Sequence, residues 1–173
     1  MVLKKILVAG LLIVFLLVLP SNAYSAVMIN EIMYNPSTAQ GDDSDLEWIE
    51  LFNNGLQTIN LENFTINGNN FGDVNITAGG FIIVARELID GADSDLNSFE
   101  AYYGNNDSIW NSTEASYTAV DGDFALGNTA PSDIINLSNR IYAQLVNYTP
   151  FLSLANGDGK TLILYKGNFT ESA

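Results

Sequence analysis

The sequence of 173 residues contains no cysteine and no histidine. Without cysteine the chain cannot form a disulfide, so its stability must come from burial, hydrogen bonds or a bound ion. Metal sites built on thiolate or imidazole ligands are excluded for the same reason. Nucleophile–base pairs that depend on cysteine or histidine are excluded as well, and this argues against an enzyme.

Positive charge is also scarce, with 6 lysine and arginine residues against 20 aspartate and glutamate residues. All 20 acids follow position 26, where only four cations oppose them, so that part has a formal charge of −16; the cations are Arg86, Arg140, Lys160 and Lys166. Such a surface repels phosphate backbones and anionic lipid headgroups, which argues against nucleic acid as a partner unless other parts of a larger protein supply cations. The alternative interpretation is solubility, or adaptation to salty surroundings.

The first 26 residues have the order of a secretory signal peptide. Lys4 and Lys5 precede an apolar run, Ile6–Leu19, and small residues follow up to Ala23 and Ala26, after either of which cleavage is expected. The alternative is an uncleaved anchor, but the run is shorter than the roughly 20 residues of a membrane span. The sequence therefore predicts a secreted or cell-surface protein with one domain at 27–173 and no membrane span after cleavage.

Short apolar runs dominate the rest of the chain, and they are typical of strands. Val27–Met33 and Glu47–Asn53 flank an acidic loop at Ser37–Asp45, and Phe81–Ala85 is apolar throughout, as expected of a buried central strand. Later strand signals lie at Phe124–Leu126, Asp133–Leu137, Ile141–Tyr148 and Thr161–Tyr165. In between, Phe99–Gly104 has helical composition and Asn105–Asp123 is a polar excursion. The pattern predicts an all-β, two-layer antiparallel fold with one short helix in a long connection.

Glu31 shares strand parity with Val27 and Ile29, which places a carboxylate on the inward face if the strand is regular. A buried carboxylate needs a partner, and Arg86 at the end of Phe81–Ala85 is one of four available cations, so a Glu31–Arg86 pair is one prediction. The alternative is a bulge or strand end that delivers Glu31 to water. The aromatic side chains of Trp48, Phe52 and Phe81 are interpreted as core.

No pair of carboxylates has the pattern of an acid/base catalyst, since Glu47 and Glu50 point to opposite faces of a regular strand. No organic cofactor is expected. Calcium is the one candidate ion, with oxygen ligands from Asp90, Asp93, Asp95 and Asn97. Ser98 and Gly104 stand where an EF-hand needs glycine and an acid, so a solvated acidic loop is the alternative.

Asn-x-Ser/Thr triplets occur seven times, and in an exported protein each is a candidate glycosylation site; the acceptors would be Asn63, Asn75, Asn106, Asn111, Asn136, Asn147 and Asn168. Chance also produces such triplets in an asparagine-rich chain, and a glycan fits a strand only on its solvent face. We expect a minority to be occupied.

In order, the runs resemble the lamin tail domain family. The matching pieces are Ile29–Pro36, Glu47–Asn53, Ile59–Phe64, Ala78–Ala85, Phe99–Gly104 and Leu126–Asn128. The match loosens after Arg140, where the family has a glycine and a different strand sequence. The resemblance implies an immunoglobulin-like β-sandwich without catalytic residues, as found in secreted prokaryotic proteins.

Together these observations predict a non-catalytic binding or tethering module that recognises a protein or glycan at the cell surface. The contact surface would lie in the loops Ser37–Asp45 and Asn105–Asp123. Two alternatives stay open. The chain could be the N-terminal accessory domain of a secreted hydrolase or nuclease whose catalytic part lies beyond Ala173, or it could be a calcium-stabilised structural module.

Overall fold

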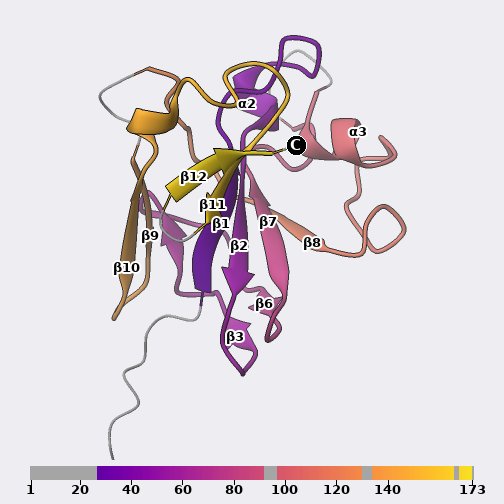
Figure 1. The fold of residues 1–173 in the computed structure, drawn as a ribbon. Coiled ribbons are helices and arrows are strands. Elements are labelled where there is room, and N and C mark those ends of the chain that lie inside the picture. Colours follow the sequence, from indigo (N-terminus) through magenta and orange to yellow (C-terminus); the bar gives the residue numbers. More distant parts are fainter. Residues whose placement is uncertain (1–26, 92–96, 130–133, 166–167, 173) are drawn as a thin grey trace, which may run out of the picture.

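Two β-layers pack face to face in the computed structural model, which describes residues 27–91, 97–129, 134–165 and 168–172 (Figure 1). The first layer has six strands in the order β12–β11–β1–β2–β7–β8; their bounds are β1 Val27–Met33, β2 Trp48–Asn53, β7 Phe81–Ala85, β8 Thr118–Asp121, β11 Leu162–Tyr165 and β12 Asn168–Glu171. All neighbours are antiparallel except β7 and β8, which run parallel. The predicted signal peptide lies outside the described residues.

The second layer has four strands in the order β10–β9–β4–β5, with bounds β4 Thr65–Ile66, β5 Asn69–Asn70, β9 Ile134–Ser138 and β10 Ala143–Asn147. β3 Ile59–Asn60 and β6 Asn75–Ile76 form a separate two-stranded sheet, whose Ile76 side chain belongs to the main core. The helices are short: α2 Asp43–Leu46, α3 Phe99–Tyr103 and a 3₁₀ turn at Thr149–Phe151. Within the described ranges, no helix is long and apolar enough to cross a membrane.

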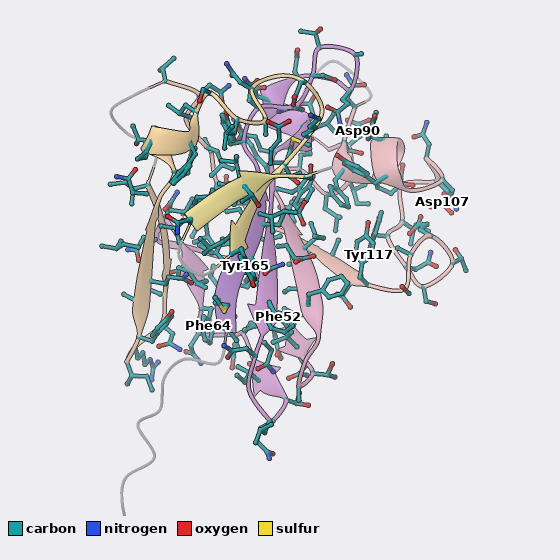
Figure 2. All side chains as sticks on the ribbon, viewed as in Figure 1. Phe52, Phe64, Asp90, Asp107, Tyr117 and Tyr165 are labelled. Carbon is teal, nitrogen blue, oxygen red and sulfur yellow. The ribbon has the colours of Figure 1, made fainter. Side chains whose placement is uncertain are left out.

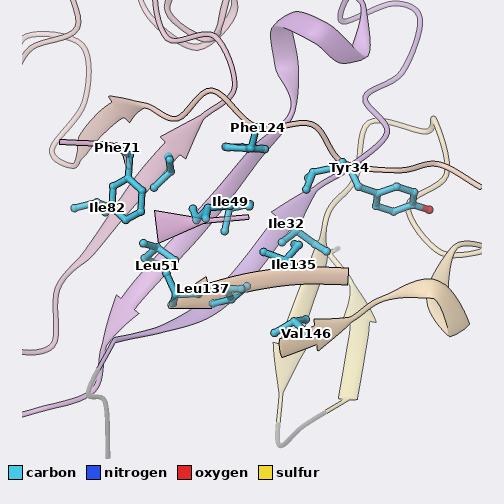
Figure 3. Packing of buried hydrophobic residues seen from close by; sticks show 14 of the residues in the cluster. Ile32, Tyr34, Ile49, Leu51, Phe71, Ile82, Phe124, Ile135, Leu137 and Val146 are labelled. Carbon is cyan, nitrogen blue, oxygen red and sulfur yellow. The ribbon is translucent and has the colours of Figure 1, made fainter. Parts of the chain in front are cut away.

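The main core lies between the layers, because alternate side chains of both sheets point inward. Figure 3 shows Ile49, Leu51 and Ile82 of the first sheet facing Ile135, Leu137 and Val146 of the second. All six side chains are at most 6% exposed. The predicted all-β two-layer fold is therefore confirmed, with the parallel pair β7–β8 as the departure from a purely antiparallel arrangement.

A bulge in β1 decides which side chains reach that core. Ile29 pairs with Leu51 and Glu31 pairs with Glu50, so Asn30 is the extra residue between two successive rungs of the β1–β2 ladder. Before the bulge Val27 and Ile29 face the core, whereas after it Ile32 does. Glu31 therefore lies on the outer face of the sheet.

A second, smaller cluster covers one end of that outer face. Met33, Trp48 and Ile83 pack there against Phe99 of α3. The helix begins at Ser98, whose Oγ accepts a hydrogen bond of 3.1 Å from the amide N–H of Ala101, and it closes at Gly104, as the sequence predicts. From Ile82 to Ala85, β7 is thus covered on both faces, which explains why this part of the strand is apolar.

Three predicted features differ in the structure. Phe124 and Leu126 are buried, but Phe124–Leu126 joins no ladder, and the acidic loop Ser37–Asp45 contains most of α2. Phe52 is half-buried and Phe81 is 45% exposed, so these two rings are not core. They lie on the outer face with Glu50, because Ile49, Leu51 and Ile82 occupy the inward positions of the same strands.

Candidate binding face

The outer face of the six-stranded sheet carries a row of apolar side chains from neighbouring strands. Met28 of β1 pairs with Phe52 of β2, and Phe52 pairs with Phe81 of β7. The Phe81 ring then contacts Tyr117, with centroids 6.1 Å apart. Side chains directly opposite each other in a ladder have Cβ atoms about 5 Å apart, so the row is continuous across the sheet.

Two carboxylates occupy the next rung of the same face. Glu31 and Glu50 are direct cross-strand partners, and both are half-buried. The Asn30 amide donates a hydrogen bond of 2.5 Å to Oε1 of Glu50, and the Thr161 hydroxyl donates to Oε1 of Glu31. Burial raises the pKa of Glu50 above its usual value; the Asn30 bond opposes this shift, and the negative charge of Glu31 adds to it.

Tyr117 is held at the end of the row by aromatic packing. Its ring lies 5.4 Å from that of Trp110, which in turn packs 5.1 Å from Phe99 of α3. The Trp110 indole N–H also donates to the Tyr117 carbonyl at 3.4 Å. Burial first, and then the carboxylate of Glu50, raise the pKa of the Tyr117 hydroxyl. The predicted excursion Asn105–Asp123 thus delivers a tyrosine to the face.

Tyr165 extends the face on its other side. It has the parity of Ile163, which pairs with Glu31, and its side chain is 62% exposed. Figure 2 shows Phe52, Tyr117 and Tyr165 along the same side of the sheet. We call the set Met28, Glu31, Glu50, Phe52, Phe81, Tyr117 and Tyr165 the outer patch. A sequence signal for it existed, because Glu50 alternates with Trp48 and Phe52 and marks their side of the strand as the outer one.

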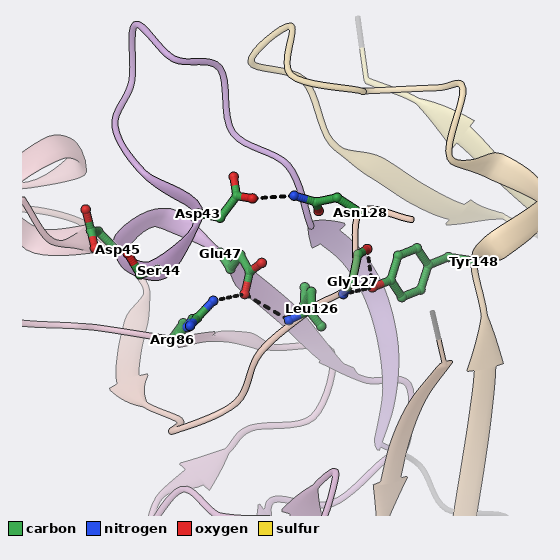
Figure 4. Close-up of polar contacts among 9 residues, drawn as sticks. All are labelled: Asp43, Ser44, Asp45, Glu47, Arg86, Leu126, Gly127, Asn128 and Tyr148. Atoms are coloured by element: carbon green, nitrogen blue, oxygen red, sulfur yellow. Dashed lines mark hydrogen bonds and ion pairs between the residues drawn. The ribbon is translucent and has the colours of Figure 1, made fainter. Parts of the chain in front are cut away.

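The predicted Glu31–Arg86 pair is wrong. Arg86 Nη1 lies 2.9 Å from Oε2 of Glu47, a carboxylate that is 1% exposed (Figure 4). The same oxygen accepts a 2.9 Å bond from the Leu126 amide N–H. Glu47 lies opposite Arg86 because Trp48 pairs with Ala85, whereas β2 separates Glu31 on β1 from β7. The bulge of the alternative interpretation is present at Asn30, and it turns Glu31 to the outer face.

The surroundings of Glu47 shift the pKa of its carboxyl group. Burial raises its pKa from 4.5 to about 7, although the bonds from Leu126 and Arg86 lower it; the nearby Asp43 raises it further. Asn128 donates to the Asp43 carboxylate, and the Tyr148 hydroxyl bonds both the N–H and the carbonyl of Gly127 at 2.8 and 2.9 Å. This network fixes 126–128 against α2, Glu47 and Tyr148 and explains the Leu126–Asn128 motif as structural.

The predicted calcium ligands are only partly visible. Asp93 and Asp95 lie outside the described residues, whereas Asp90 and Asn97 are described. A different group, Glu100, Asp107 and Glu114, brings one carboxylate oxygen each to within 4.8 Å of the others. The Glu100 carboxylate accepts the backbone N–H groups of Asp107 and Ser108 at 2.9 and 3.1 Å. Glu100 therefore has a structural role as the anchor of this loop, and calcium binding stays a prediction.

The seven candidate glycosylation sites differ in accessibility. Five of the asparagines are exposed, namely Asn63, Asn75, Asn106, Asn147 and Asn168. Asn111 and Asn136 are half-buried, and Oδ1 of Asn136 is fully buried. A glycan therefore meets fewer neighbours at the first five positions.

A separate depression of about 670 Å³ opens beside the Glu47–Arg86 pair. Its lining includes Arg86, Asp121, Asp123 and Gly91. The positive charge of Arg86 in this lining is already paired with Glu47. The outer patch is the better defined surface.

The family model described as Lamin Tail Domain matches residues 20–170 of the chain. No curated protein and no solved structure matches the chain.

Proposed function

Because the chain belongs to the lamin tail domain family, we propose that it is an exported, non-catalytic module that binds a protein or glycan through the outer patch. The family is one of immunoglobulin-like domains, and the two-layer sandwich described above has that architecture. A fold alone does not define a ligand, so the proposal depends on the surface. Export is part of the proposal and is supported by the composition of residues 1–26.

The observation that carries the proposal is the row Met28–Phe52–Phe81–Tyr117. Two of its rings are phenylalanines, which contribute nothing polar to a solvated surface, and Phe81 is 45% exposed. Contiguous exposed apolar side chains rimmed by polar groups mark interaction sites on soluble proteins. Aromatic residues are also enriched at the energetic centres of interfaces.

Washed cells of the source organism, incubated with the labelled chain, would test the proposal. The variant Phe52→Ser/Phe81→Ser removes both phenylalanine rings from the outer patch and should abolish retention of the chain on the cells. The matched control is Leu145→Ser, which removes a 70% exposed apolar side chain from β10 in the opposite layer. Equal retention of the patch variant and the native chain would reject the outer patch as the contact surface.

A further inference from the structure

The outer patch holds two like charges that form no ion pair with a cation of the described residues. Glu31 and Glu50 face each other directly across the β1–β2 ladder, an arrangement that destabilises a sheet. Their hydrogen-bond partners are neutral, an amide from Asn30 and a hydroxyl from Thr161. Among the described residues, the ion pairs are formed by Arg86 with Glu47 and by Lys160 with Asp158 and Glu171, so no described cation pairs with Glu31 or Glu50.

Aromatic rings border these carboxylates on the same face. Phe52 lies two residues along β2 from Glu50, and Phe81 pairs with Phe52. The Tyr117 ring contacts the Phe81 ring, with centroids 6.1 Å apart. Carboxylates accept the N–H groups of a guanidinium or an ammonium, and neighbouring ring faces attract the same cation and pack against its alkyl stem.

Resting on the function proposed above, we infer that the outer patch recognises a basic protein segment and binds an arginine or lysine side chain between Glu31 and Glu50. The alkyl stem of that side chain packs along Phe52 and Phe81. Charge complementarity selects this occupant. A neutral glycan leaves the two carboxylates uncompensated, and an anionic glycan is repelled by them and by the acidic chain as a whole, which has 20 acids against 6 cations.

The test uses the full chain and three synthetic probes, measured by calorimetric titration. One decapeptide alternates arginine with serine, a second alternates glutamate with serine, and the third probe is a neutral oligosaccharide of hexoses. We expect the arginine peptide to bind and the other two probes not to bind. The variant Glu31→Gln/Glu50→Gln should raise the dissociation constant of the arginine peptide at least about tenfold, since it removes two charge-assisted contacts.

A matched variant separates the patch from general charge attraction. Glu62→Gln/Asp73→Asn removes the same charge from two exposed acids elsewhere and should change the dissociation constant less than about twofold. Thermal unfolding checks the fold, and the Glu31→Gln/Glu50→Gln variant should unfold at a higher temperature because it relieves repulsion. Equal losses in both variants would overturn the inference, as would binding of the oligosaccharide through the outer patch. If the arginine peptide fails to bind while Phe52→Ser/Phe81→Ser still abolishes cell retention, this inference fails and the proposed function stands.

Discussion

Arg86 and Glu47 form an ion pair of 2.9 Å in which the carboxylate is 1% exposed and the arginine side chain is 29% exposed. The pair joins the end of β7 to the residue before β2, and the Leu126 amide completes it. A carboxylate placed there depends on its partner, because burial without neutralisation is costly.

Removing Arg86 should therefore destabilise the fold. We expect Arg86→Met to lower the free energy of unfolding by about 3 kcal/mol at pH 8, where Glu47 is ionised, since loss of one partner leaves a buried charge unpaired. Urea denaturation measures this change in the free energy of unfolding. Arg140→Met, which removes an exposed cation, should stay within about 0.5 kcal/mol; a similar loss in both variants would show that the pair has no special role.

The pKa of Glu47 predicts a pH dependence. The folded state binds this proton up to about pH 7, whereas in the unfolded state the group titrates near 4.5. Between these values the folded state holds more protons, so the contribution of Glu47 to stability falls as pH rises from 4.5 to 7 and is constant above. Across this window the free energy of unfolding of the native chain should fall by about 3 kcal/mol more than that of Glu47→Gln, as measured by chemical denaturation at several pH values. Parallel curves would contradict the shift.

The two faces of the same strands should respond differently to truncation. Leu51 is 0% exposed in the main core, so Leu51→Ala should cost about 2–5 kcal/mol of stability. Phe81→Ala, on the outer face, should cost less than about 1 kcal/mol, although it removes more atoms. Chemical denaturation gives both values, and a larger loss for Phe81→Ala would place that ring in the core after all.

The cap of α3 should support one end of the outer patch. Ser98→Ala removes the acceptor for the Ala101 N–H and should cost about 1 kcal/mol. Amide hydrogen exchange in Phe99–Tyr103 should become faster while exchange in β1 and β2 is unchanged. Uniformly faster exchange would mean that α3 unfolds only together with the sandwich.

Much of the fold was predictable because alternation is local. β1, β7 and α3 lie where the sequence places them, and β2 begins one residue late. A bulge was one of the alternatives for Glu31, but its position at Asn30 was not predictable, since a one-dimensional pattern does not reveal which residue is extra in a ladder. The partner of Arg86 was not predictable either, because it depends on the register of β2 against β7.

The parts of the outer patch that were not predicted from the sequence escaped for similar reasons. Alternation predicts that Ile49 and Leu51 share a face, but it does not say which face is covered, and large aromatic side chains at Phe52 and Phe81 suggested burial. Only Glu50 between Trp48 and Phe52 indicated otherwise. The parallel pairing of β8 with β7 also escaped prediction, because strand partners are set by tertiary contacts across the long connection that carries Tyr117.

Site-specific photocrosslinking tests whether the outer patch contacts the partner. A photoreactive phenylalanine analogue replaces Phe81 in the outer patch in one chain and Leu145 on β10 in another, and each chain is irradiated on washed cells. We expect a crosslinked product from position 81 that is absent from position 145. Crosslinking from position 145 alone would show that the opposite layer is the binding surface.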